Sequence, residues 1–588
     1  MKKRFIILFS LIISSASFAQ KQRKDTLETA VVEISTTFNP DITDVKKIRN
    51  NPSLKFSKRT KKKKLNYNFF SAPVASTFIP KTGIIKVLDV RKKEQLYKNY
   101  IAAGYGNFSS PYVEIFLHSS ARFNSEFGIN TKYLASYNNI QDTKLNSTFS
   151  NFNTEAFYKK KDRYFNWEIG VQTERNSYNW YGLPKLNFTA LTLNNIEEAQ
   201  QYNTFCLDGG FKFDDAYVDY INLSFSNFTD KFNSNETHIL LNSKLDYPLY
   251  KIGQFFNTNN DITLQTNIDY LKGFFEKNYT TNEKIAYSIF TINLEPSYSY
   301  NHKIFTINAR LKTTFSSDSE NSVNHFFLLP NLHMKSKLHK QRVAIYSGFK
   351  SGLHTNTYQQ FSSKNPFVSP TLFLTQTLEK SNYYIGFHGN ITNTLSYNIK
   401  ASAKNEEDKP LFLRNNSKSD GTRFITNGNK LLGYEFGNSF GIVYDDVKTT
   451  AFLGELAYEF SEYLSFNTQI TYRNFKLTNA LSPWNLPSFE GVFTANYKKN
   501  QWFVNATIFY INERFDGIYD TRSQSRPVGY QNLRGFVDVN ISGRYHISKK
   551  ISSFLNINNL LNNQYQRFAN FPVQGFQLLA GITYKFDF

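Results

Sequence analysis

Two short acidic runs are the densest groups of potentially catalytic side chains in the chain. Asp445 and Asp446 are adjacent, and Glu406, Glu407 and Asp408 form the second run. Paired carboxylates can act as general acid and base, and several together can bind a cation. Adjacent residues of a strand point to opposite faces, so Asp445 and Asp446 could not act together there. We expect this pair in a turn and the other run in a solvated loop.

The other chemically active side chains show no spacing that is typical of a catalytic or metal centre. The nine His residues are scattered without a His-x-x-x-His pair, and the sequence has no Walker loop and no G-x-G-x-x-G turn. A single cysteine, Cys206, excludes an intramolecular disulfide framework and a Cys-rich metal site. We therefore predict no catalytic residue, no metal site, no cofactor and no enzymatic activity.

The elements that would position any site alternate in polarity from about residue 98 onward. In 464–473, 489–498 and 537–547, apolar and polar residues occupy alternate places, the period of a strand with two different faces. Aromatic residues make up 17 % of the chain, yet the mean hydropathy is −0.47. No run after the first twenty residues is long and apolar enough for a membrane helix. These features predict an all-β fold, a transmembrane antiparallel β-barrel with apolar residues facing lipid and polar residues facing the lumen.

The C-terminus carries the same alternation to the last residue. Every second residue from Phe576 to Phe588 is apolar or aromatic. Chain ends fray unless they are held, and in a closed barrel the last strand pairs with the first. This argues against a soluble β-sandwich or propeller, whose strands are also usually shorter. Tyr584, Phe586 and Phe588 are similar to the terminal signal that the barrel assembly machinery recognises in bacterial outer-membrane barrels.

The connections between the expected strands alternate between short and long. Short ones are expected at 461–463, 498–501 and 548–550, and long ones at roughly 174–199, 474–487, 514–533 and 560–574. Short periplasmic turns and long external loops are the rule for such barrels. The count comes to roughly 22 strands, but the alternation does not close between about 404 and 450, so one strand there is missed or invented.

The N-terminus indicates export. Residues 1–19 have Lys2, Lys3 and Arg4 before an apolar core, with Ser17 and Ala19 preceding a cut before Gln20, the pattern of a signal peptide. The net charge of +22 is spread along the chain, and we expect no nucleic-acid partner. The basic run at 58–64 fits a solvated periplasmic linker, or contact with anionic lipid, cell-wall polymer or an acidic partner.

The C-terminal sequence FLNINNLLNNQYQRFANFPVQGFQLLAGITYKF resembles the end of TonB-dependent outer-membrane receptors. Asn559, Leu560, Leu561, Asn562 and Tyr565 fall on the family motif, with Leu561 in place of the usual Phe. The resemblance covers roughly 98–588, and the FAQ ending of the signal peptide is similar to members from Bacteroidota. It implies a barrel in the outer membrane of a Gram-negative bacterium, with outer-membrane lipid around it.

The segment DTLETAVVEIS resembles the energy-coupling Ton box of that family. Its core is Leu27, Glu28, Thr29, Ala30, Val31, Val32, Glu33 and Ile34. Such a segment is an extended strand that can add to the sheet of a TonB-type energy-coupling protein. The alternative is an ordinary strand or a disordered tail.

The arm at 20–97, expected in the periplasm, departs from the family. It is too short for a full plug domain, so we expect a truncated plug region before a barrel at 98–588. A barrel of about 22 strands has a lumen that is normally plugged. The arm could thread into it, long outer loops could fold inward, or a partner such as a lipoprotein could close it.

Three functions follow from these alternatives. One is a TonB-dependent receptor-like barrel for uptake of a scarce ligand, whose ligand-binding residues the sequence does not identify. Another is a plug-less structural barrel that serves as a subunit of an outer-membrane complex. The last is a passive porin-type channel.

Overall fold

The structure is a computed structural model, and it describes residues 97–587 except 122–123, 215, 249–259, 282, 340–341, 427 and 520–525. The predicted signal peptide, the arm with Leu27–Ile34 and the terminal Phe588 lie outside the described residues. The statements below concern the described part of the chain.

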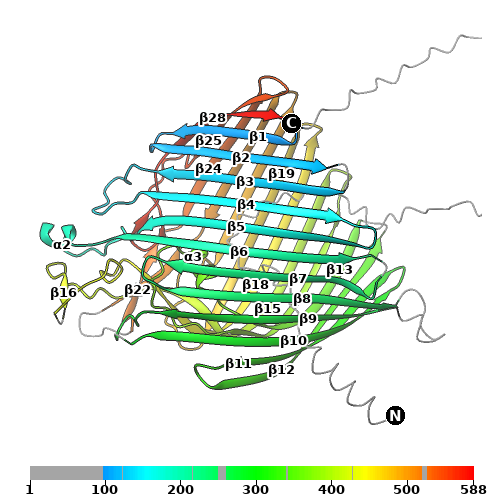
Figure 1. Cartoon of the computed structure of the whole chain (residues 1–588), viewed down its shortest axis with the longest axis horizontal. Helices are drawn as coiled ribbons and strands as arrows, with labels where there is room; N and C mark the ends of the chain where they lie inside the picture. The colour runs from blue at the N-terminus through cyan, green and yellow to red at the C-terminus, as the bar shows by residue number, and fades with distance from the viewer. Residues whose placement is uncertain are drawn as a thin grey trace, which may run out of the picture. The chain divides into compact units, whose positions relative to one another are not determined.

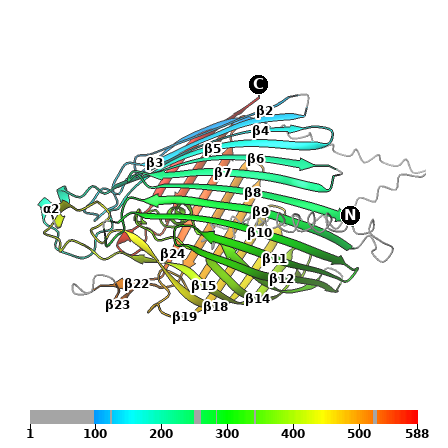
Figure 2. The ribbon, with the colours of Figure 1, turned by 60° about the horizontal axis from the view of Figure 1, so that its bottom comes forward.

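Twenty-two strands form one sheet in which every neighbouring pair is antiparallel (Figures 1 and 2). The sheet closes because the first strand, β1, pairs with the last, β28, from Asn99 opposite Phe586 to Gly106 opposite Leu579. A closed sheet of this kind has no edge at its seam. The predicted barrel and its predicted number of strands are therefore confirmed.

The first half of the barrel comprises strands β1 to β12. Their bounds are β1 Asn99–Gly106, β2 Ser110–Ala121, β3 Ser125–Ser136, β4 Phe149–Lys161, β5 Phe165–Asn179, β6 Ala199–Phe213, β7 Val218–Asp230, β8 Asn235–Pro248, β9 Asn260–Phe275, β10 Ile285–Asn301, β11 Phe305–Asp318 and β12 Val323–His339.

The second half completes the sheet with ten strands. They are β13 Val343–His354, β14 Thr377–Asn390, β15 Leu395–Arg414, β18 Phe440–Ser461, β19 Leu464–Leu477, β20 Phe489–Lys499, β21 Trp502–Ile511, β24 Phe536–His546, β25 Ile551–Asn558 and β28 Gln577–Phe586. The loops add the short pairs β16 Ile425–Thr426 with β17 Asn429–Lys430, β22 Arg514–Ile518 with β23 Gly529–Leu533, and β26 Gln566–Phe568 with β27 Phe571–Pro572, and the helices α2 Ala190–Asn194 and α3 Tyr358–Lys364.

The period-two pattern places polar side chains inside the barrel. In β24, Asp538 accepts a hydrogen bond from the Tyr565 hydroxyl and Asn540 accepts one from the backbone of Asn559, both in a loop that folds over the inner face. On β28, Ile582 and Tyr584 are 58 % and 45 % exposed on the outer face. Alternate residues of a strand point to opposite faces, so one polarity pattern specifies both surfaces of the wall.

The connections predicted as long lie at one end of the strands and those predicted as short at the other, although 107–109, 231–234 and 319–322 at the first end have only three or four residues. The turns at 462–463, 500–501 and 547–550 are short, and the loops at 180–198, 478–488, 512–535 and 559–576 are long. Figure 1 shows α2, β16 and β22 together at one end, which we call the long-loop end. The predicted alternation of the connections is confirmed.

The region between 404 and 450 contains two unusually long strands rather than a missing one. β15 and β18 have 20 and 22 residues and are joined by the loop 415–439. Both acidic runs lie in these strands, so their predicted positions in a turn and a loop were wrong. A bulge between Glu406 and Lys409 absorbs the irregular register. In β15 and β18 the paired strands are much longer than the roughly 9–11 residues that cross a membrane. The alternating pattern of the sequence does not show where such a strand ends.

None of the described residues forms a helix that is long and apolar enough to cross a membrane.

Candidate functional site

The loop between β13 and β14, residues 355–376, folds over the inner face of the barrel, and we call it the inner loop. It carries α3, whose N-cap Thr357 accepts a hydrogen bond from the backbone of Gln360. A side-chain oxygen at this position satisfies a free N–H of the first turn and fixes where the helix begins. Tyr358 and Phe361 of α3 are 0 % and 1 % exposed. Tyr358 packs against the rings of Phe228 and Phe275 on the barrel wall, so the inner loop is buried against that wall.

Glu236 of β8 holds the start of α3. Its Oε2 accepts hydrogen bonds from the Tyr358 backbone N–H at 2.7 Å and from the Tyr287 hydroxyl at 2.9 Å. Its Oε1 accepts one from the Gln359 backbone N–H at 3.0 Å. The carboxylate is 2 % exposed and lies against the first turn of a helix, where backbone N–H groups are free and negative charge is stabilised.

Asp230 at the end of β7 binds the side chain of the same helix residue. Its Oδ2 accepts a hydrogen bond from the Tyr358 hydroxyl at 2.8 Å, and its Oδ1 accepts the backbone N–H groups of Phe232 and Ser234. Burial and the nearby Asp230 raise the pKa of Tyr358 well above its usual range. The Tyr202 hydroxyl of β6 donates to the Pro366 carbonyl at 2.9 Å. The inner loop is thus tied to three consecutive strands.

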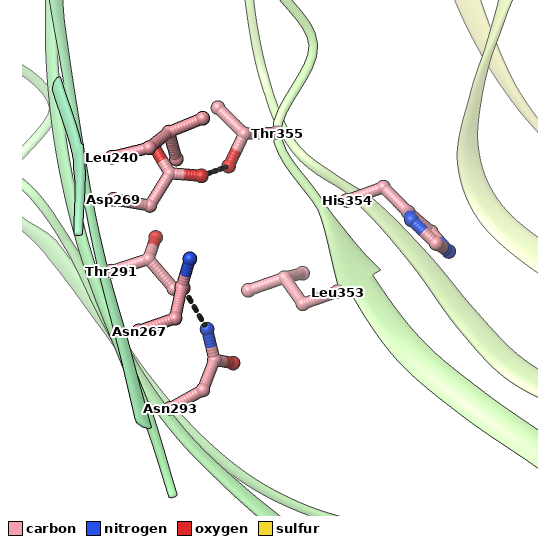
Figure 3. Close-up of a pocket in the computed structure, with 8 residues that line it drawn as sticks. All are labelled: Leu240, Asn267, Asp269, Thr291, Asn293, Leu353, His354 and Thr355. Atoms are coloured by element: carbon pink, nitrogen blue, oxygen red, sulfur yellow. Dashed lines mark hydrogen bonds between the residues drawn. The ribbon is translucent and has the colours of Figure 1, made fainter. Parts of the chain in front are cut away.

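A third acid, Asp269 of β9, anchors the point where the inner loop leaves β13. Its Oδ2 accepts a hydrogen bond from the Thr355 hydroxyl at 2.9 Å, and its Oδ1 lies 2.9 Å from Nε2 of His238. Figure 3 shows Asp269 and Thr355 beside a cavity of about 20 Å³ between the inner wall and the end of β13. That volume holds about one water molecule, so the cavity is a packing feature rather than a ligand site.

The side of the inner loop that faces away from β6–β10 packs against β18 and against the last long loop, 559–576. Phe367 stacks on Phe571 with ring centroids 3.8 Å apart, and the Ser369 backbone N–H donates to the Phe440 carbonyl at 2.8 Å. Phe440, Phe568 and Phe571 belong to the same buried cluster as Tyr358. The inner loop therefore joins the β6–β10 wall to β18 and to the last long loop. Of the three predicted ways to close the lumen, inward-folded outer loops are present.

Three further loops pack together at the long-loop end. Leu145, Phe188, Ile196, Leu431 and Phe436 form a small buried cluster between 137–148, 180–198 and 415–439. Glu435 lies in it and accepts hydrogen bonds from Lys277 and Lys418, each at 2.7 Å. Burial alone would raise the pKa of Glu435, but these two ammonium groups outweigh it and hold the pKa below its usual range. Tyr181 of the 180–198 loop packs against both this cluster and the buried cluster of the inner loop.

The opposite inner wall, from β19 to β25, carries two central rows of uncharged polar residues that we call the polar ladder. Its members lie in register on adjacent strands and none is buried: Ser465, Asn467, Thr494, Asn496, Asn505, Thr507, Asn540, Ser542 and Asn556. The Asn505 amide donates to Asn496 at 2.7 Å, and the Ser542 hydroxyl donates to Asn556 at 2.6 Å. Amides and hydroxyls at these positions can exchange hydrogen bonds with water or a solute.

The predicted assembly residues Tyr584 and Phe586 lie on β28, stacked at 5.8 Å between ring centroids, and β28 is paired on both edges. The Ton-box-like residues and Phe588 lie outside the described residues. Sequence reasoning missed Glu236, Asp230 and Tyr358. The Thr357 cap before an aromatic segment was a signal for α3, but nothing local pointed to partners more than 100 residues away.

The expectation that no spacing is typical of a catalytic centre was wrong for one stretch, because Gly437–Gly441 has the G-x-S-x-G spacing of a hydrolase nucleophile elbow. Ser439 is completely buried, donates to the Tyr434 carbonyl at 2.6 Å and accepts from the Asn415 amide. A nucleophilic serine needs an exposed hydroxyl and a neighbouring base. Ser439 therefore has a structural role. No group of three His, Cys, Asp or Glu within the described ranges could hold a metal ion.

No protein-family model matches the chain, and no curated protein is significantly similar to it in sequence. Solved structures do share its fold. The FrpB iron transporter from Neisseria meningitidis aligns with a TM-score of 0.62 and 10 % identity over 84 % of this chain and 83 % of its own. The ferripyoverdine receptor of the Pseudomonas aeruginosa outer membrane gives 0.59 and 11 %, over 84 % and 73 %. The copper transporter OprC gives 0.58 and 11 %, over 84 % and 82 %.

These identities establish a shared fold and nothing finer. Each aligned structure is, by its name, a receptor or a transporter. The described part of the chain therefore has the fold of an outer-membrane receptor barrel, as the C-terminal motif predicted.

Proposed function

We propose that this protein is a receptor-like barrel of the outer membrane that takes up a scarce ligand and opens only when driven. The observation that carries the proposal is the inner loop, which crosses from the β6–β10 wall to β18 and the last loop and is held by buried acids. A loop that blocks the lumen would prevent passive diffusion through the barrel. A receptor needs such a closure, because its lumen would otherwise leak solutes.

The energy would come from the periplasmic side. We propose that Leu27–Ile34 adds as a strand to a TonB-type coupling protein, as an extended peptide adds to a sheet edge. The remainder of the 20–97 arm would transmit the pull, and the terminal residues Tyr584, Phe586 and Phe588 would direct assembly of the barrel. The resemblance of 27–34 to a Ton box supports this part of the proposal.

Conductance in planar bilayers tests the closure. We expect wild-type protein to conduct poorly and a variant with 358–373 replaced by a short Gly-Ser linker to form steady pores. A matched control deletes the β16–β17 hairpin, residues 425–430, which is exposed at the long-loop end, and should stay closed. Steady conductance by the wild type would identify a porin-type channel instead.

Disulfide trapping tests the coupling separately. Single cysteines at positions 27 to 34, in a Cys206→Ser background, would be combined with a TonB-type C-terminal domain that carries its own cysteine. Cross-links that depend on position and alternate along the segment are expected for strand addition. If the barrel assembles and no position cross-links, the coupling idea is wrong and a structural role in an outer-membrane complex becomes the better explanation.

A further inference from the structure

The inner wall formed by β12, β13 and β14 carries four aromatic rings side by side. We call them the ring platform: His333, Tyr346, Tyr384 and His388. Neighbouring ring centroids lie 5.8–6.5 Å apart, with the ring planes inclined by 26–47°. The alternate residues of the same strands, such as Leu332 and Ile385, are exposed and apolar on the outer face. The rings therefore cover a patch of the inner wall rather than stack face to face.

Two glycines make room for the tyrosine rings. In the ladder between β13 and β14, Tyr346 is directly opposite Gly386, and Gly348 is directly opposite Tyr384. A Cβ atom on either glycine would overlap the tyrosine side chain on the other strand. Each ring can therefore cross the neighbouring strand close to the backbone.

Hydrogen bonds fix the two rings where they cross. The Tyr346 hydroxyl donates to Oδ1 of Asn398 on β15 at 2.7 Å, and the Asn398 amide donates to Glu455 at 2.8 Å. The Tyr384 hydroxyl lies 2.8 Å from Nδ1 of His333 on β12. Side chains that are already held in place lose little freedom when they bind a ligand, so the ring platform is preorganised.

Ammonium groups surround the ring platform. Lys350 and Lys400 lie over the Tyr384 ring, 5.9 and 5.0 Å from its centroid, and Lys335 is directly opposite Tyr346 in the β12–β13 ladder. Within the described ranges, neither Lys335 nor Lys350 forms an ion pair with an acid. Imidazole and phenol groups can bind metal ions, but these ammonium groups would repel a cation and attract an anion.

The exposure of the rings decides what kind of anion fits. His333, Tyr346 and His388 are partly exposed, whereas Tyr384 is buried beneath the ammonium groups of Lys350 and Lys400. Partly exposed ring faces pack well against another flat ring. Charge-assisted hydrogen bonds from lysine bind carboxylate oxygens.

We propose that the ring platform binds a planar aromatic anion, of the aryl carboxylate class, inside the lumen. Its ring would lie against His333, Tyr346 and His388, and its charge beside Lys335 and Lys350. Tyr346 and His388 lie near the strand ends that adjoin short turns, so a ligand entering from the long-loop end reaches them only after the inner loop opens. The inference rests on the proposed uptake function for its role, and it names the class of ligand taken up.

Binding of naphthoate to the full-length protein in nanodiscs tests the proposal, measured by equilibrium dialysis with empty nanodiscs as the blank. Naphthamide has the same rings without the charge, and decahydronaphthoate has the charge without planar rings. We expect each to bind about fivefold more weakly than naphthoate, because each lacks one of the two interactions. Equal binding of all three probes, or no binding of naphthoate, would overturn the proposal.

Matched variants locate the site. Lys335→Gln combined with Lys350→Gln should weaken naphthoate binding about tenfold and leave naphthamide binding unchanged. Tyr346→Leu should weaken the binding of both. The control Lys498→Gln removes a lysine from the inner face of β20, on the wall of the polar ladder, and should change neither. A loss in the control as large as in the double variant would mean that the positive charge of the lumen attracts the probe without a site, which would overturn the proposal.

The binding test and the tests of the uptake function fail separately. Naphthoate binding requires neither the coupling segment nor a closed lumen. If naphthoate does not bind while the wild type stays closed in planar bilayers, this ligand class is wrong and the uptake function stands. If the probe binds at the ring platform while the wild type conducts steadily, the platform is supported and the uptake function is wrong.

Discussion

The two inner walls of the barrel bury their polar groups differently. On β7 to β10, Asp230, Glu236 and Glu295 are 8 %, 2 % and 3 % exposed, and each accepts hydrogen bonds. On β19 to β25, no member of the polar ladder is buried, and the charged pair Arg473–Glu490 of the same wall keeps 19 % and 18 % of its side chains exposed. Charged groups lose hydration when they are covered, so they persist inside a protein where specific partners replace the water. The charged wall is the one that holds the inner loop, and the polar ladder is the one left to solvent.

The largest effect is expected when the charged wall loses its main acceptor. Glu236→Ala would leave the Tyr287 hydroxyl and the N–H groups of Tyr358 and Gln359 without an acceptor. A buried donor without a partner costs about 1–3 kcal/mol, so we expect the inner loop to be destabilised by about 3 kcal/mol or more. Hydrogen exchange of 355–376 should accelerate strongly, while the closed barrel keeps its heat-modifiable migration on gels.

The conservative variant separates loss of hydrogen bonds from loss of fold. Glu236→Gln retains one acceptor oxygen and should accelerate exchange less than Glu236→Ala. Unchanged exchange of the inner loop in both variants would mean that its aromatic packing alone holds it, and the contrast between the two walls would lose its meaning.

The features that follow from local pattern were predictable from the sequence. Alternation in 464–473, 489–498 and 537–547 placed strands β19, β20 and β24 and the faces they present. The paired C-terminal strand followed from the same pattern. These predictions rest on the two-residue period of a strand and need no knowledge of distant contacts.

The candidate site was not predictable, because its contacts join distant parts of the chain. Tyr358 meets Asp230 and Glu236 across 128 and 122 residues. The sequence of 355–376 contains no pattern that predicts whether the loop folds into the barrel or away from it. The position of the acidic run 406–408 was predicted wrongly for a related reason. Backbone pairing with β18 makes β15 longer than a membrane crossing requires. Such pairing depends on the neighbouring strand rather than on the segment itself.

A smaller effect is expected in the loop 512–535, where Asp516 is buried. Asp516 of β22 is 0 % exposed and accepts hydrogen bonds from the backbone N–H groups of Arg414 and Gly517. Burial raises its pKa from 3.8 to about 6. The folded loop therefore binds the proton more tightly than the unfolded chain, so its stability is greatest below about pH 4 and is lost as the pH rises through about 6.

Asp516→Asn should remove that pH dependence. Because the ionised acid costs about 3 kcal/mol at pH 8, the variant should be the more stable protein there by up to that amount, and the two should be similar near pH 4. Hydrogen exchange of 512–519 at both pH values, corrected for intrinsic rates, measures the difference. A wild-type loop that is equally stable at pH 4 and pH 8 would show that Asp516 is hydrated in the folded loop.

The smallest effect is expected within the polar ladder itself. Asn496→Ala removes the acceptor of the Asn505 amide, a partly buried hydrogen bond of 2.7 Å. Because water can take the place of the lost oxygen, the cost in free energy of unfolding should stay below about 1 kcal/mol, far less than for Glu236 on the charged wall. Urea unfolding of the two variants in the same detergent makes the comparison. If Asn496→Ala lowered the free energy of unfolding as much as Glu236→Ala, water would have no access to the polar ladder. Both inner walls would then be buried by protein, instead of one buried wall and one wall in contact with solvent.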